Sequence, residues 1–253
     1  MVGSTLQRYF VENIVNNKAN ISGEDVHHIA RVMRMDVGDQ LYCCDSDGKV
    51  ARCEITEITN ESVLTNVVEW MKNSVELPIN VSIVSGLPKA DKLEYVIQKG
   101  TELGASEFVP FIAARSIVKW DEKKGSKKVE RWNKIAKEAA EQSHRSKIPT
   151  VQAPISFKQL ISLSANHDYK LIAYEEEARR GEKSNLASTF DKMKTGETLL
   201  IVVGPEGGLT EKEVTLLHKN GFISCSLGPR ILRTETAPLY LLAAVSYYFE
   251  LTR

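Results

Sequence analysis

Between Leu6 and Trp70, β-forming residues occur in short runs separated by turn signals such as Asp45-Ser46-Asp47-Gly48. This pattern predicts strands at residues 8–11, 40–44, 50–55 and 63–68. One helix interrupts the strands, with Ser22 as its expected N-cap and one apolar face formed by Val26, Ile29, Ala30 and Met33. A small β-barrel with one helix accounts for this part of the chain.

After a plausible linker at residues 71–78, the pattern changes to strands and helices in alternation. Apolar strands are predicted at residues 79–84, 108–112, 170–174, 198–203 and 222–227. Helices are predicted near 91–103, 127–146, 156–164, 211–219 and 237–250, with a capping box at Thr210 and Glu213 and with Pro238 in the first turn of the last helix. This alternation is typical of an α/β domain with a parallel sheet and helices on both faces.

The composition, 42% hydrophobic and 26% charged over 253 residues, is that of an ordinary globular protein. No apolar run approaches 18 residues, so no membrane span is expected. The first five residues lack the basic and apolar blocks of a signal peptide, and we expect a cytoplasmic protein. The four cysteines show no CxxC spacing, so we expect buried free thiols and no metal site.

The formal net charge of zero hides an uneven distribution. Residues 1–74 hold 7 Lys and Arg against 11 Asp and Glu, a net of −4. Residues 115–147 hold 11 Lys and Arg against 5 Asp and Glu, a net of +6. The basic block fits contact with nucleic-acid phosphates, but a solvated helix face fits it equally well.

Two glycine-containing loops each follow a predicted buried strand and precede a helix. The first is Gly204-Pro205-Glu206-Gly207-Gly208, and its spacing matches neither GxGxxG nor a P-loop. The second runs from Leu227 through Gly228 to Ala237 and carries Arg230, Arg233 and Glu235. A plain connection needs only a turn and a cap, so these loops predict a ligand pocket at the carboxyl ends of parallel strands.

The paired loops resemble the signature of the SPOUT methyltransferases, most of all the branch that methylates N3 of a uridine in 16S rRNA. The resemblance extends from Leu6 to the C-terminus and includes Arg8-Tyr9-Phe10, residues 28–34 and residues 99–104. It implies an α/β domain with a deep trefoil knot at residues 75–253, after a PUA-like, RNA-binding β-barrel at residues 6–71. It also implies S-adenosylmethionine as cofactor, a homodimer, and 16S rRNA, within the 30S particle, as substrate.

The resemblance further suggests roles for individual residues. Cofactor binding is expected at Ile172, Tyr174, Val203, Gly204, Glu206, Gly207, Gly208, Leu227, Gly228, Ile231, Leu232 and Thr234. For Ile172 and Tyr174, ordinary packing in the sheet core is an equally good interpretation. Arg233 is expected to hold the uracil or a phosphate, and Glu235 or Glu206 to orient polar groups or accept the N3 proton. RNA contacts are expected at Arg8, His28, Arg31, Arg34, Arg115 and Arg145.

Three alternatives remain open at this level. A related enzyme of the same class would methylate a ribose hydroxyl or a tRNA base. An RNA-binding assembly factor would keep the fold without turnover. A generic α/β nucleotide binder is disfavoured because both of the usual phosphate-binding motifs are absent.

Overall fold

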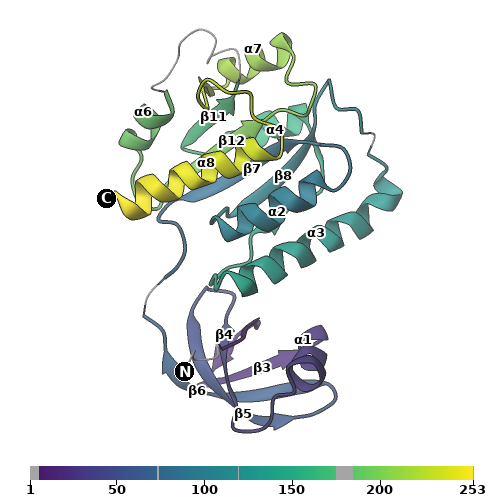
Figure 1. Ribbon diagram of the computed structural model, residues 1–253, viewed down its shortest axis with the longest axis vertical. Helices are drawn as coiled ribbons and strands as arrows, with labels where there is room; N and C mark the ends of the chain where they lie inside the picture. The colour runs from purple at the N-terminus through teal and green to yellow at the C-terminus, as the bar shows by residue number, and fades with distance from the viewer. Residues whose placement is uncertain (1–5, 73, 119, 175–184, 253) are drawn as a thin grey trace. The chain divides into compact units, whose positions relative to one another are not determined.

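The computed structural model of the chain describes residues 6–72, 74–118, 120–174 and 185–252 (Figure 1). The first five residues, where the sequence predicted no signal peptide, lie outside the described part. The chain divides into two compact units: Met1–Glu76 with Ala140–Lys147, and Leu77–Ala139 with Ile148–Arg253. The sequence-based domain boundaries, 6–71 and 75–253, left residues 140–147 out of the first unit, and as domain boundaries they stay a prediction.

The described part of the first unit contains one six-stranded sheet with the order β1-β4-β5-β6-β3-β2. The strands are β1 (Arg8–Phe10), β2 (Ile14–Val15), β3 (Lys18–Ser22), β4 (Gln40–Cys44), β5 (Val50–Ile58) and β6 (Ser62–Trp70). Neighbours run antiparallel except β1 and β4, which run parallel. The sheet is a PUA-like curled half-barrel, because no pairing between its outer strands β1 and β2 closes it among the described residues.

The helix of this unit differs from the prediction in its geometry. A short α1 (Glu24–His27) continues as a π-helical segment, η1 (His28–Met33). Val26 and Ile29 are buried as predicted, but Met33 is 39% exposed, because the wider π-turn changes which residues face the core. The predicted N-cap was wrong: Ser22 ends β3, and Gly23 precedes the helix without a side-chain cap.

The second unit has, in its described part, a parallel sheet of seven strands. They are β7 (Asn80–Gly86), β8 (Glu107–Ile112), β9 (Thr150–Val151), β10 (Ile155–Ser156), β11 (Tyr169–Ala173), β12 (Thr198–Val203) and β13 (Ile223–Cys225). Their order is β10-β8-β7-β12-β11-β13, with β9 paired to β8. The two strands that precede the glycine-containing loops, β12 and β13, therefore lie on either side of β11.

Helices cover both faces of this sheet, as the alternation predicted (Figure 1). They are α2 (Lys92–Glu102), α3 (Glu122–Gln142), α4 (Phe157–Ser164), α6 (Asn185–Lys192), α7 (Glu211–Lys219), α8 (Thr236–Ser246) and the π-helical η2 (Tyr247–Leu251). Successive residues of a strand point to opposite faces. In β12, Leu199 and Ile201 accordingly join one apolar cluster, while Leu200 and Val202 join the other.

The predicted capping box of α7 is confirmed, because Thr210 Oγ1 accepts a hydrogen bond from the Glu213 backbone at 3.2 Å and the Glu213 carboxylate bonds back. The sequence analysis missed α6. The trefoil knot depends on how the loops after β12 and β13 thread, and it stays a prediction. None of the helices in the described residues is long and apolar enough to cross a membrane.

Candidate methyl-transfer site

The two glycine-containing loops meet at the carboxyl edge of the parallel sheet. Because β11 lies between β12 and β13, the end of β11 is flanked by both loops. A cavity of about 350 Å³ opens there. Its lining consists of Arg115, Ala173, Tyr174, Val203, Gly204, Pro205, Glu206, Gly207, Gly208, Leu209, Leu227, Gly228, Arg230, Ile231, Leu232, Thr234 and Ala237.

Every residue predicted to bind cofactor lines this cavity except Ile172. Ile172 is fully buried and belongs to an apolar cluster of the sheet, so its contacts are those of ordinary core. Of the residues expected to take part in catalysis, Glu206 lines the cavity, whereas Arg233 and Glu235 do not. The predicted binding loops thus line the cavity. Arg233 and Glu235, two of the three residues expected to take part in catalysis, lie outside its wall.

Two glycines, one in the first loop and one in the neighbouring strand β7, determine the path of this loop. Gly208 adopts a φ of +70°, which other residues rarely adopt, and its Cβ position faces open space. Gly86, at the end of β7, lies so close to the loop that a Cβ there would fall 2.5 Å from the backbone nitrogen of Pro205. The loop therefore follows a path that depends on glycine both within it and in the neighbouring strand.

The segment after β8 also holds the first loop in place. The Glu213 carboxylate, 6% exposed as a residue, accepts a hydrogen bond from the Ala114 backbone at 2.8 Å. Next to it, Arg115 Nη1 donates to the carbonyl oxygen of Gly207 at 3.2 Å. Arg115 was predicted to contact RNA, and this stays a prediction; its guanidinium lies against the loop and lines the cavity.

A cluster of charged groups adjoins the cavity. Lys92 Nζ lies 3.0 Å from Glu206 Oε1 and 3.4 Å from Glu235 Oε2. The backbone N–H of Lys89 also donates to Glu206 Oε1, at 3.2 Å. Arg233 Nη1 lies 4.0 Å from Glu235 Oε1, with its own side chain 83% exposed.

Opposing effects act on the pKa of Glu206. Burial raises this pKa, but hydrogen bonds from the backbone N–H groups of Glu206 and Lys89 and from the Lys92 ammonium group outweigh it, so the net pKa is lowered. The hydrogen bond to Glu206 in turn raises the pKa of Lys92. Glu206 is therefore an ionised carboxylate, and Lys92 a cation, at neutral pH.

The sequence analysis missed Lys92 and several apolar residues of the wall, and it named Arg230 in the second loop without giving it a role. A signal for Lys92 was present in the topology rather than in a motif. The loop after β7 must lie beside the loop after β12, because β7 and β12 are paired parallel neighbours. That pairing is a long-range feature that periodicity does not reveal.

The residues predicted to contact RNA in the first unit fall into two groups. Arg31 and Arg34 are exposed, and their side chains have no hydrogen-bond or ion-pair partner among the described residues. His28 is half-buried, and its Nδ1 lies 3.0 Å from the hydroxyl of Tyr9. These three side chains remain RNA-binding candidates.

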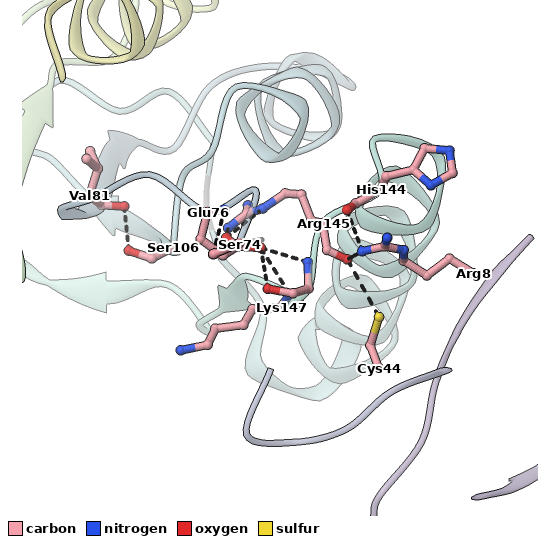
Figure 2. Close-up of polar contacts among 10 residues, drawn as sticks. Arg8, Cys44, Ser74, Glu76, Val81, Ser106, His144, Arg145 and Lys147 are labelled. Carbon is pink, nitrogen blue, oxygen red and sulfur yellow. Dashed lines mark hydrogen bonds and ion pairs between the residues drawn. The ribbon is translucent and has the colours of Figure 1, made fainter. Parts of the chain in front are cut away.

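Arg8 and Arg145 have structural contacts instead (Figure 2). Arg145 is 4% exposed and pairs with the carboxylate of Glu76. Arg8 Nη1 donates to the carbonyl oxygens of His144 and Arg145, the latter at 2.9 Å. These contacts favour a role in holding the end of α3 within the first unit over a direct contact with RNA.

The four cysteines are free and buried. The described residues contain no group of three or more His, Cys, Asp or Glu side chains arranged to hold a metal ion.

Comparison with known proteins decides the family. Residues 75–246 match the profile of an RNA methyltransferase domain, and residues 21–68 match that of an RNA methyltransferase PUA domain. The chain is 53% identical to ribosomal RNA small subunit methyltransferase E of Bacillus subtilis, over 98% of this chain and 99% of the relative. This chain belongs to the ribosomal RNA small subunit methyltransferase E family. The resemblance inferred from the two loops is thereby confirmed.

Solved structures of relatives agree with this assignment. The methyltransferase E of Neisseria gonorrhoeae, solved with S-adenosylmethionine, is 25% identical, with a TM-score of 0.82 over 97% of this chain and 98% of that one. A Legionella pneumophila protein solved with the same cofactor is 29% identical, with a TM-score of 0.81 over 96% of this chain and 97% of that one. Both units of methyltransferase E, the PUA-like half-barrel and the SPOUT-type α/β domain, are therefore present here.

Proposed function

We propose that this protein transfers a methyl group from S-adenosylmethionine to N3 of a uridine in 16S rRNA. The glycine-lined cavity with Glu206 in its wall is the observation that carries the proposal. Support also comes from the methyltransferase E family membership and from two relatives that bind this cofactor. Action on ribosomal RNA would place the enzyme in the cytoplasm.

The residues of the cavity fit the cofactor. The volume, about 350 Å³, is in the range of sites for small molecules. Glycines at Gly204, Gly207 and Gly208 expose main-chain groups that can hydrogen-bond to an adenine edge, while Tyr174 and Leu227 offer apolar surface to the ring. When bound, the cofactor supplies an electrophilic methyl group on a sulfonium. The chain itself contributes orientation, which can lower a barrier by about 7–11 kcal/mol.

Charged side chains next to the cavity would act on the base. N3 of uracil carries a proton that must leave before or during methylation, and the anion that remains needs stabilisation. Arg233 is exposed and free to turn toward the uracil oxygens or a phosphate. Glu206 and Glu235 are the candidate proton acceptors, and both lie in the charged cluster that includes Lys92.

RNA binding is assigned to the exposed face of α1 and η1. Arg31 and Arg34 there carry solvated guanidinium groups, which suit phosphates and unstacked bases. Val32 and Val37 lie close to them in the sequence and are 59% and 63% exposed, so apolar surface adjoins the arginines. Arg8 donates a hydrogen bond to the carbonyl oxygen of Arg145, which is buried in the first unit. These two residues are not part of the assigned face.

The homodimer is a further part of the proposal. Exposed apolar side chains occur on the C-terminal helix, with Tyr240, Tyr247 and Leu251 exposed by 43%, 63% and 74%. Exposed aromatic surface of this kind is typical of protein interfaces. Light scattering after gel filtration should give twice the chain mass of 28.3 kDa, and Tyr247→Lys should shift the protein toward monomer. A wild-type monomer at micromolar concentration would contradict the dimer.

The substrate is tested by offering three RNAs in parallel. Labelled cofactor is incubated with 30S particles that lack the modification, with protein-free 16S rRNA, and with tRNA. Because residues 1–74 carry a net charge of −4, we expect shaped contacts of the particle to be needed and 30S particles to be methylated best. Equal labelling of protein-free 16S rRNA would refute the particle as substrate, and labelling of tRNA alone would refute the proposed target.

A further inference from the structure

Lys92 stands between two carboxylates that come from different loops of the site. It is the first residue of α2, and its ammonium group reaches Glu206 of the first loop at 3.0 Å and Glu235 of the second at 3.4 Å. The three side chains are 33%, 28% and 17% exposed, respectively, so the cluster is partly shielded from water. One cation thus links both loops that form the cavity.

Lys92 does not itself line the cavity, whereas Glu206 does. Any influence of Lys92 on the reaction would therefore pass through the carboxylates. Glu235 Oε2 is buried, and the Lys92 ammonium group lies 3.4 Å from it, whereas the Arg233 guanidinium lies 4.0 Å from the other oxygen of the same carboxylate. Without it, Glu206 and Glu235 would lose the cation that they share, and Arg233 would still lie 4.0 Å from Glu235.

We propose that Lys92 is a positioning residue for methyl transfer, which couples the two loops through Glu206 and Glu235. The proposal rests on the methyltransferase function proposed above. Lys92 keeps the carboxylates at a fixed separation beside the bound base. An error of about 1 Å in such a placement can cost a factor of about 100 in rate.

Three variants test the role. Lys92→Met removes the charge and keeps most of the length, Lys92→Arg keeps the charge, and Lys99→Met removes a lysine of the same helix that pairs with Glu102 on the surface. We expect Lys92→Met to lower kcat about 10–100-fold with a much smaller change in KM for the cofactor. We expect Lys92→Arg to restore most of the activity and Lys99→Met to behave as wild type.

Two further readouts separate positioning from a merely structural role. Loss of Lys92 raises the pKa of Glu206, so the acid limb of the rate profile should move to higher pH in Lys92→Met only. Hydrogen–deuterium exchange, which needs no turnover, should become faster in both loops, at residues 204–208 and 230–236, in the same variant.

The outcomes are distinct. Unchanged exchange in the two loops would overturn the coupling. A fall in activity that tracks the melting temperature, with an unmoved pH profile, would reduce Lys92 to a stabilising residue and also overturn the proposal. If exchange in both loops becomes faster in Lys92→Met but the wild-type enzyme methylates no ribosomal RNA, the proposed function fails while the coupling of the loops stands.

Discussion

Glu76 accepts a hydrogen bond from Arg145 Nε at 3.1 Å, although the two residues lie 69 positions apart in the chain (Figure 2). The second oxygen of the same carboxylate accepts hydrogen bonds from Ser146 N at 2.8 Å and from Lys147 N at 3.1 Å. One side chain therefore neutralises a buried guanidinium and satisfies two backbone N–H groups just beyond α3. This is the local reason why residues 140–147 belong to the first unit.

Glu76→Gln should destabilise the protein strongly. The amide keeps the shape of the side chain but leaves Arg145, whose side chain is 5% exposed, without its counter-charge. Removing one partner of a buried ion pair costs about 3–5 kcal/mol in the free energy of unfolding. Urea unfolding, followed by circular dichroism, measures this loss in the free energy of unfolding. The control is Glu94→Gln, whose partner Arg131 is 66% exposed and for which a loss below about 1 kcal/mol is expected. Equal losses in both variants would contradict the account.

The ion pair between Glu76 and Arg145 predicts that the stability of the protein depends on pH. Burial raises the pKa of Glu76, but Arg145 and Ser146 lower it more, so the pKa in the folded state is below its usual value. A depressed carboxyl pKa contributes stability above the unfolded-state pKa of about 4.3, and this contribution is lost as pH falls through the folded-state pKa. The free-energy difference between wild type and Glu76→Gln should therefore shrink from pH 6 to pH 3. A difference that stays constant over this range would argue against the ionised pair.

Gly86→Ala should weaken cofactor binding. Its Cβ would fall 2.5 Å from the backbone nitrogen of Pro205, so the first loop must shift. Overpacking of this kind costs about 1–3 kcal/mol, and part of that cost should appear as a higher Kd for S-adenosylmethionine in calorimetry. The neighbouring Ser85→Ala removes a buried hydroxyl that has no hydrogen bond among the described residues, adds no atom, and should bind as wild type. Wild-type affinity in Gly86→Ala would show that the loop path is not needed for the cofactor.

Arg233→Ala should impair turnover and spare cofactor affinity. The Arg233 side chain is 83% exposed and does not line the cavity, so its proposed contact is with the RNA base or a phosphate. A hydrogen bond to a charged group contributes about 1.5–3 kcal/mol, which corresponds to a loss of about 10–100-fold in kcat/KM. Lys212→Ala, on the exposed surface of α7, is the matched control. Full turnover of Arg233→Ala would remove the residue from the site.

Local patterns in the sequence predicted much of the fold. The apolar runs located the main strands of the second unit, and Thr210 with Glu213 located the start of α7. The short strands β2 and β3 were missed, because Asn16 and Asn17 form their turn in left-handed backbone conformations that the hydrophobic pattern does not signal. The π-turn in η1 was missed for a similar reason, since it depends on how the helix packs rather than on its own residues.

The candidate site was predictable as far as it lies in its two loops. Gly204–Gly208 and the loop after β13 were recognised by their composition, and both line the cavity. Lys92 could not be found in this way, because its contact with Glu206 spans 114 positions and depends on the pairing of β7 with β12. Arg145 is the opposite case: a basic residue in a basic stretch indicates RNA, and only the fold reveals its buried partner Glu76.

The most direct test of the central claim is the identity of the methylated nucleoside. Purified enzyme is incubated with labelled S-adenosylmethionine and 30S particles from a strain that lacks the modification, and the 16S rRNA is digested to nucleosides for mass spectrometry. The account predicts that the label appears as 3-methyluridine, and that Lys92→Met forms the same product more slowly. Label in a methylated ribose or another base, or cofactor binding without any labelled RNA, would contradict it.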